Sequence, residues 1–316
     1  MLSISVVIPT YRRAPDLRRC LAALKRQRRP ADQIVVVCRE HDLESQEVAA
    51  KRRGEVVELA LVAEGGAVAA YNAGFDAARS DIVAIIDDDT VPPQDWLERI
   101  EHRYAADARL GGLGGRDIVH VGGKPIPSSE PVVGIVQFHG RMIGNHHLGC
   151  GDAREVHVLK GANMSFRAAA LAGARFDRRL LGAGAQVHLE VQPCVAVRRN
   201  GWHLLYDPAV VVDHFPAVRH DEDGRDRFSE VAQRNAVHNE TLALLDFLPA
   251  WRRPIFLLWA CAIGTRASPG LLQAVRLAAR GERNGMARLR ASLSGRWAGV
   301  RTWQESRAGV ELRNRR

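Results

Sequence analysis

The chain has 316 residues, 46% of them hydrophobic, so it can bury a large core as one α/β domain with an appended region. Its net charge of +9 is carried by the C-terminal part: from Thr241 onward there are 14 Arg, no Lys and 4 acidic residues, whereas the first 240 residues have a net charge of −1. This asymmetry argues against a nucleic-acid partner and favours a basic appendage that faces an anionic surface.

The N-terminal residues and the cysteines indicate the compartment. The opening stretch, MLSISVVIPT, has neither a basic segment nor a long apolar one, so we expect no signal peptide. The five cysteines are scattered, odd in number and without metal-type spacing, which fits a reducing environment better than a disulfide framework. We therefore expect a cytoplasmic protein.

Apolar runs alternate with helical patterns through the first hundred residues. Each run is uniformly apolar, and each is followed by residues with apolar positions three or four apart. This alternation is typical of a doubly wound, mostly parallel α/β sheet with helices on both faces. Strands are predicted at 4–9, 34–38, 56–60 and 82–86, and helices at 15–27, 43–54, 65–80 and 92–107.

After Asp107 the pattern becomes irregular and rich in Gly and Pro. We expect a mixed half with strands near 113–121 and 155–159, a helix near 186–200, two short strands within 202–215 and a helix from about 226 to 247. The predicted division is an α/β domain over 1–225, with halves 1–110 and 111–225, and a helical, Arg-rich extension over 226–316.

Three consecutive carboxylates, Asp87, Asp88 and Asp89, directly follow the apolar strand at 82–86. Neighbouring like charges oppose one another's ionisation unless a cation lies among them. In an open parallel sheet, ligands bind beyond the carboxyl ends of the strands, which is where these residues stand. The alternative is a capping Asp with solvated neighbours. The position favours a site for a divalent metal, Mg²⁺ or Mn²⁺.

Four segments in order, SVVIPTYRR, GGAVAAYNAGFDAARSDIVAIIDDD, GANMSF and YDPAVVVDH, resemble the family 2 glycosyltransferases of the GT-A fold, over residues 3–216. The resemblance implies inverting, metal-dependent transfer of a sugar from a nucleotide-sugar to a hydroxyl of a saccharide or lipid-linked acceptor, in surface polysaccharide or glycolipid synthesis. One alternative is a sugar nucleotidyltransferase, but PTYRRAP lacks the Gly-rich loop of that class. Another is a non-catalytic scaffold subunit.

The same resemblance implies roles for single residues. Asp87, Asp89 and His214 would bind the metal. The acceptor and sugar cleft would include Gly161, Ala162 and Asn163. Asp42 would substitute for the family's base-reading Asp after the second strand, which leaves the donor base open. The other nucleotide contacts implied are Pro9, Thr10, Tyr11, Arg12, Asn72, Gly74, Asp87 and Asp88.

The family's acceptor base, usually Asp, falls on Glu190 when counted back from Arg199. Leu189 precedes it, where the family has a polar residue. A Glu can act as the base if it reaches the hydroxyl, although its extra methylene moves the oxygens by roughly 1 Å. His188 is the alternative base, because an imidazole exchanges protons near neutral pH.

The C-terminal tail allows two interpretations. Ile255 to Ile263 is too short an apolar run for a bilayer span, which needs about 20 residues, so it predicts an interfacial or core helix. A basic amphipathic helix is predicted further on. It either packs on protein or attaches peripherally to anionic lipid on the inner face of the membrane. Its apolar positions are Met286, Leu289, Leu293, Trp297 and Val300.

Overall fold

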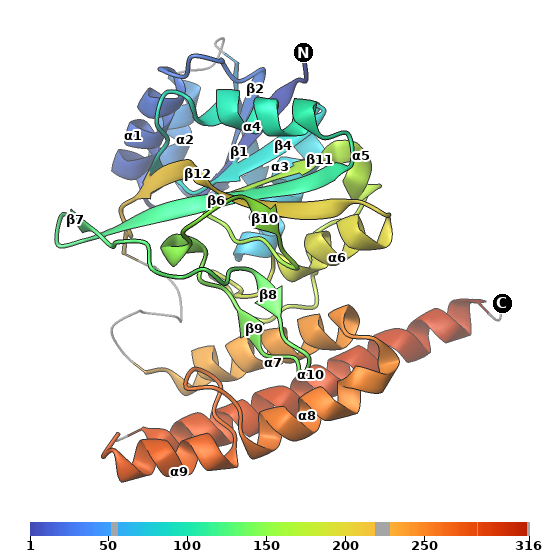
Figure 1. Cartoon of the computed structure of the whole chain (residues 1–316). Coiled ribbons are helices and arrows are strands. Elements are labelled where there is room, and N and C mark those ends of the chain that lie inside the picture. The colour runs from blue at the N-terminus through green and yellow to red at the C-terminus, as the bar shows by residue number, and fades with distance from the viewer. Residues whose placement is uncertain (52–55, 219–227, 283, 315–316) are drawn as a thin grey trace. The chain divides into compact units, whose positions relative to one another are not determined.

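The computed structural model describes residues 1–51, 56–218, 228–282 and 284–314 (Figure 1). The chain divides into two compact units. The first comprises Met1–Ile135, Ile143–Phe176 and Pro193–Val218, and the second comprises Val136–Met142, Asp177–Gln192 and Arg219–Arg316. The boundary predicted at 225–226 lies outside the described residues. Segments 136–142 and 177–192 group with the C-terminal helices, which the sequence pattern did not indicate.

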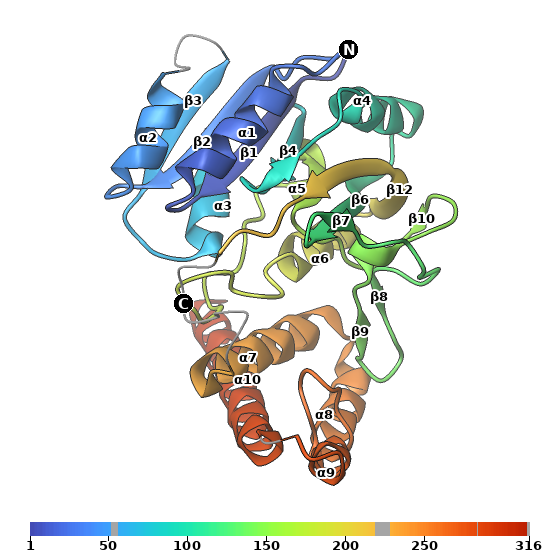
Figure 2. The same cartoon turned by 90° about the vertical axis from the view of Figure 1, so that its left-hand side faces the viewer.

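The four predicted parallel strands form one half of the sheet in the first unit, in the order β4-β1-β2-β3 (Figures 1 and 2). The predicted fold class, an α/β sheet that is mostly parallel, is confirmed. The strands are β1 (Ile4–Thr10), β2 (Gln33–Arg39), β3 (Val57–Val62) and β4 (Ile82–Ile86). The connecting helices are α1 (Ala14–Leu24), α2 (Leu43–Ala50), α3 (Ala67–Ala77) and α4 (Trp96–Ala106).

Alternate side chains of these strands contact helices on opposite faces, as the period of a strand requires. Val6 and Ile8 belong to the core beneath α1, α2 and α4. Val7 points to the other face, where α3 packs so closely that a Cβ on Gly74 would lie 2.2 Å from Val7 Cγ1. Figure 2 shows α1 and α2 on one side of the strands and α3 on the other.

The rest of the sheet is mixed. β11 (Asn163–Arg167) lies antiparallel between β4 and β6 (Leu110–Val121), and the sequence pattern did not predict it. β12 (His203–His214), predicted as two short strands, is one strand parallel to β6, with an irregularity between Asp207 and Val211. The full order among the described residues is β10-β12-β6-β11-β4-β1-β2-β3, with β5 beside β12 and β7 beside β6.

Short strands, helices and 3₁₀ turns connect the main elements. The predicted strand near 155–159 is reduced to the two-residue β10, and the predicted helix near 186–200 begins later, as α6. The bounds are β5 (Thr90–Val91), β7 (Lys124–Pro125), β8 (Ile135–Val136), β9 (Met142–Ile143), β10 (Arg154–Glu155), α5 (Ala168–Leu171), α6 (Val191–Arg199) and the 3₁₀ turns η1 (His146–Leu148) and η2 (Ala250–Arg252).

The helices of the second unit pack through small residues. A Cβ on Gly295 would lie 2.5 Å from the carbonyl oxygen of Arg234, and one on Gly299 would lie 2.8 Å from that of His238, so α10 lies directly against α7. Met286 and Trp297 of the predicted apolar stripe are exposed. Leu289 of the same stripe is buried, so the helix packs on its own chain with part of the stripe facing inward and part facing outward. The helices are α7 (Glu230–Phe247), α8 (Arg253–Ala262), α9 (Leu271–Ala279) and α10 (Gly285–Asn314).

One buried ion pair accompanies this helix packing. Arg296 Nη2 lies 3.2 Å from Glu240 Oε2, and both side chains are buried between α10 and α7. Some of the tail's basic residues therefore serve the fold and not an external partner. Within the described part of the chain, no helix combines the length and the apolar character that crossing a membrane requires.

Substituting Gly74 tests the close approach of α3 to β1. We expect Gly74→Ala to lower the free energy of unfolding by about 1–3 kcal/mol, because the added methyl group overpacks the contact with Val7. Urea denaturation measures this change.

Gly144→Ala is the matched control. An added Cβ there meets no atom within 4 Å, so we expect a change within about 0.5 kcal/mol. If both variants were equally stable, the tight helix–strand contact would be contradicted.

Candidate active site

Three predicted metal ligands come together at the carboxyl edge of the parallel strands. Asp87 and Asp89 follow β4, and β12 returns antiparallel to β5, which pairs His214 with Thr90. One ligand atom from each of Asp87, Asp89 and His214 lies within 4.8 Å of the others. Two segments more than a hundred residues apart therefore form one acidic cluster with an imidazole.

Asp88 lies apart from this cluster. Its Oδ1 is 3.0 Å from Nη1 of Arg13, the residue that precedes α1, and both carboxylate oxygens are buried. Burial raises the pKa of Asp88 to about 7, although Arg13 opposes that shift. The sequence reasoning named Arg12 and missed Arg13. The available signal was the need of a buried acidic run for a neighbouring cation.

His214 lies between two carboxylates. Its Nε2 is 3.3 Å from Asp89 Oδ1 and its Nδ1 is 3.4 Å from Asp117 Oδ2. Burial alone would lower the pKa of His214, but hydrogen bonds to Asp117 and Asp89 overcome this and raise it to about 9. The ring therefore carries a proton here that balances part of the acidic charge.

Asp117 and Lys160 support the cluster from behind, and the sequence reasoning missed both. Lys160 Nζ donates to Asp117 Oδ2 at 2.9 Å. Burial would raise the pKa of Asp117, yet His214 and Lys160 hold it at about 2, so this carboxylate stays charged. An acidic residue at a buried position of strand β6 was the signal that could have identified it.

The donor set fits a divalent cation. Carboxylate oxygens with one imidazole are common metal ligands, and buried Asp89 Oδ1 receives no well-directed hydrogen bond beyond the ion pair with His214. A cation would take the place of the proton on His214 Nε2. Nδ1–H would then donate to Asp117, the arrangement that orients metal-binding histidines. Tyr71 Oη, at 3.2 Å, donates to Asp87 Oδ1.

The loops after β1 and β2 form a second group of predicted residues. The backbone N–H of Arg12 donates to Asp42 Oδ2 at 2.6 Å, and Asp42 Oδ1 also accepts from Ser45 N at the start of α2. The Arg39 guanidinium lies 4.0 Å from the ring centroid of Tyr11. Asp42 thus holds the turn that carries Tyr11. Its base-reading role, like those of Pro9 and Thr10 at the end of β1, remains a prediction.

Other predicted ligand-binding residues have structural contacts that explain them without a ligand. Asn72 accepts from Phe176 N at 2.8 Å and donates to Phe176 O at 3.0 Å. Asn163 accepts from Trp96 Nε1 at 3.0 Å and donates to Val210 O at 2.8 Å. Both amides are buried, as is Ala162, which leaves Gly161 as the accessible member of the predicted Gly-Ala-Asn segment.

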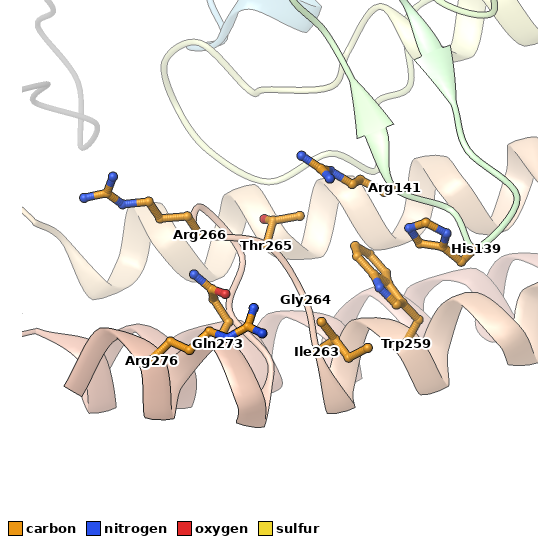
Figure 3. A pocket seen from close by; sticks show the side chains of 9 residues that line it. All are labelled: His139, Arg141, Trp259, Ile263, Gly264, Thr265, Arg266, Gln273 and Arg276. Carbon is orange, nitrogen blue, oxygen red and sulfur yellow. The ribbon is translucent and has the colours of Figure 1, made fainter. Parts of the chain in front are cut away.

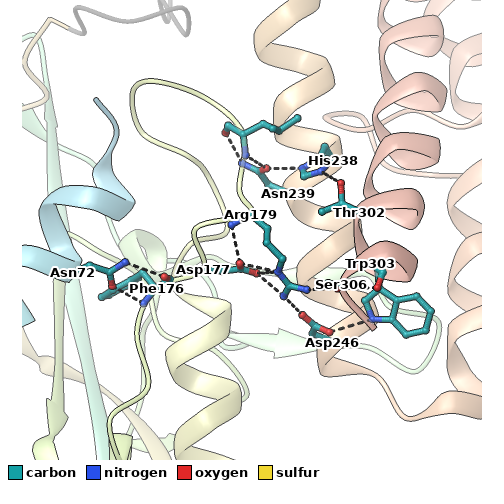
Figure 4. A network of polar contacts seen from close by, with 11 residues as sticks. Asn72, Phe176, Asp177, Arg179, His238, Asn239, Asp246, Thr302, Trp303 and Ser306 are labelled. Carbon is teal, nitrogen blue, oxygen red and sulfur yellow. Dashed lines mark hydrogen bonds and ion pairs between the residues drawn. The ribbon is translucent and has the colours of Figure 1, made fainter. Parts of the chain in front are cut away.

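Glu190 and His188 lie in the segment 177–192, which belongs to the second unit. That segment is held by polar contacts (Figure 4). Arg179 donates hydrogen bonds to Asp177, Asp246 and Ser306. Asn239 accepts a hydrogen bond from the N–H of Leu181 at 2.8 Å and donates one to its carbonyl oxygen at 3.0 Å. Leu189 is buried, which explains an apolar residue where the family has a polar one. The choice between Glu190 and His188 as base remains a prediction.

Two solved structures share the architecture. One is S. aureus TarS 1-349 in complex with UDP-GlcNAc, with a TM-score of 0.55, 14% identity and coverage of 98% of this chain and 92% of that one. The other is the mannosyltransferase PcManGT from Pyrobaculum calidifontis in complex with GDP-Man and Mn²⁺, with a TM-score of 0.50, 18% identity and coverage of 95% and 85%. The predicted GT-A fold is confirmed by this shared architecture.

The sequence comparisons identify the family. Residues 5–172 match the family model described as glycosyl transferase family 2. A stretch of 101 residues is 32% identical to glycosyltransferase AglE of Haloferax volcanii; it covers 30% of this chain and only 33% of that relative's length. The chain belongs to glycosyl transferase family 2.

The metal site can be tested by direct Mn²⁺ binding. We expect Asp89→Asn to weaken Mn²⁺ binding by at least about tenfold, because one charged oxygen ligand is lost. Electron paramagnetic resonance of free Mn²⁺ measures the affinity.

Two further variants calibrate that result. Asp117→Asn should weaken binding by about 10–100-fold through loss of the His214 orientation. Asp76→Asn, which neutralises an exposed acidic residue on α3, should leave the affinity unchanged. Equal affinities for all of these proteins would place the ion elsewhere.

Proposed function

We propose that this chain is a metal-dependent, inverting glycosyltransferase that moves a sugar from a nucleoside diphosphate to an acceptor hydroxyl. The observation that carries the proposal is the Asp87–Asp89–His214 cluster, placed at the carboxyl edge of the sheet in a family 2 chain. A cluster of two carboxylates and an imidazole is suited to a divalent cation, which in turn suits a diphosphate.

The proposed reaction needs two kinds of group from the protein. Asp87, Asp89 and His214 hold the cation, which when bound neutralises charge on the leaving diphosphate. Glu190, with His188 as the alternative, takes the proton of the acceptor hydroxyl. The acceptor oxygen bonds to the anomeric carbon as the bond from that carbon to the diphosphate oxygen breaks. A single displacement inverts the anomeric centre, so no protein nucleophile is used.

The loops after β1 and β2 are the proposed contacts of the nucleotide. Tyr11, beneath the Arg39 guanidinium, presents an aromatic ring beside the end of β1, and the turn that carries it is fixed by Asp42. The solved structures with this fold bind GDP-Man with Mn²⁺ and UDP-GlcNAc. These two donors are therefore the first to test, and the donor base is left to the experiment.

The charge of the C-terminal part bears on the acceptor and on the location of the protein. We infer a saccharide or lipid-linked acceptor, used in surface polysaccharide or glycolipid synthesis on the cytoplasmic side of a membrane. The support is the C-terminal charge: 14 Arg against 4 acidic residues after Thr241 would hold the chain peripherally on an anionic surface.

Nucleotide binding tests the donor assignment. We expect one of UDP, GDP, TDP and CDP to raise the melting temperature in the presence of Mn²⁺ but not without it, and Asp89→Ala to lose this effect. The matching nucleotide-sugar should then release its nucleoside diphosphate on incubation with the enzyme. Asp76→Ala is the control and should behave as wild type. No stabilisation by any of the four would overturn the proposed function.

Substitution of the base separates chemistry from donor binding. Glu190→Gln should lower kcat by at least about 100-fold, because the proton acceptor is removed, while KM for the donor changes little. Steady-state kinetics on the donor found above measure both. If Glu190→Gln keeps its rate while His188→Asn loses it, His188 is the base.

A further inference from the structure

Strands β8 and β9 pair as a hairpin whose tip is residues 137–141. We propose that α8, α9 and this hairpin tip form a docking surface for an anionic lipid bilayer, with a cationic pocket that receives a lipid phosphate. The inference deepens the peripheral attachment proposed above and does not depend on glycosyl transfer. All of these residues belong to the second unit.

The pocket is cationic and has an aromatic wall (Figure 3). Its volume is about 270 Å³, and Arg141, Arg266, Arg276, His139 and Trp259 are among the residues that line it. Figure 3 shows Arg141 on the hairpin side and Arg276 on the side of α9. No acidic residue lines the cavity among those described, although Glu282 lies 3.0 Å from Arg266. The guanidinium groups of Arg141 and Arg276, with the amide of Gln273 in the same lining, suit a phosphate.

The walls of this pocket are fixed by backbone contacts. Gly264, with φ of 69°, turns the chain after α8, and the N–H of Gly270 donates to Ile263 O at 3.1 Å. Arg252 donates to Gln137 O at 2.6 Å and to Phe138 O at 2.8 Å, which ties the hairpin tip to the end of η2. Arg141 is therefore presented by an anchored hairpin, so the pocket is preorganised.

Large apolar side chains are exposed on the elements that carry the pocket. Leu258 on α8 is 73% exposed, Val275 on α9 is 66% exposed, and Leu271 is 58% exposed. The rings of Phe138 and Trp251 lie 5.7 Å apart and are also largely exposed. Apolar and aromatic side chains interspersed with arginines are typical of segments that lie in the membrane interface.

Charge decides which partner fits. Residues 249–282 contain five Arg and one acidic residue, so a second copy of this chain would bring like charges together. An anionic bilayer suits both the arginines and the exposed apolar side chains. Its phosphates pair with the guanidinium groups, and its acyl boundary takes up the apolar side chains.

Cosedimentation of the full chain with vesicles tests the surface. We expect binding to phosphatidylcholine vesicles that contain phosphatidylglycerol, and none to phosphatidylcholine alone. Arg141→Gln/Arg276→Gln should weaken the binding roughly 25-fold, from about 1 kcal/mol for each Arg at an anionic surface. The matched control is Arg18→Gln/Arg26→Gln, which removes the same charge from exposed positions in the first unit and should weaken it less than about threefold.

A second pair of variants separates apolar insertion from charge. Leu258→Asn/Val275→Asn should weaken vesicle binding at least about tenfold with an unchanged melting temperature, because both side chains are exposed. The proposal is overturned if the charge control matches the pocket variant, if neutral vesicles bind equally, or if inorganic phosphate stabilises the wild type but not the pocket variant while anionic vesicles do not bind, which would make the pocket a free-phosphate site. Mn²⁺-dependent stabilisation by the nucleotide should persist in every variant. A failure of the proposed membrane surface can therefore be distinguished from a failure of the proposed activity.

Discussion

The acidic run Asp87–Asp89, in which Asp88 and Asp89 are buried and Asp87 is half-buried, is the constraint on which the first unit depends. In a low-dielectric setting such a run is unfavourable unless each member has its own partner. Arg13 before α1 serves Asp88, Tyr71 on α3 serves Asp87, and His214 at the end of β12 serves Asp89. These partners come from three separate elements, so the strand order that returns β12 to β5 is also what makes the acidic cluster possible.

Local pattern predicted the parallel half of the sheet because uniformly apolar runs such as Ile82–Ile86 admit few alternatives. It could not predict β11, whose Asn163 and Ser165 look like loop residues but are buried and paired with Trp96 and Tyr104. The predicted metal ligands Asp87 and Asp89 stand out in the sequence because they flank Asp88 in one acidic run. Asp117 was missed because its partner, His214, lies 97 residues further on, and only the folded sheet joins them.

The tail shows a different limit of hydrophobic pattern. The apolar stripe of the long C-terminal helix predicted contact with protein or with lipid, in both cases through its large side chains. Closest approach between helices needs small residues instead, and Gly295 and Gly299 supply it against α7. Trp297 is left outside as a consequence. Large apolar residues on a basic helix therefore do not indicate by themselves which face is buried, since backbone proximity can decide it.

The hydrogen bonds of Asn239 and Asp246 to segment 177–192 determine whether the C-terminal extension could be separated from the rest of the chain. Both residues stand on α7, outside the stretch that matches the family, yet they secure the segment that carries Glu190. A chain cut after β12 would keep its acidic cluster but lose Asn239, the partner of Leu181, and Asp246 and Ser306, two of the partners of Arg179. The Arg-rich extension is thus not a detachable accessory: exchanging it between relatives would also exchange the framework of the candidate base.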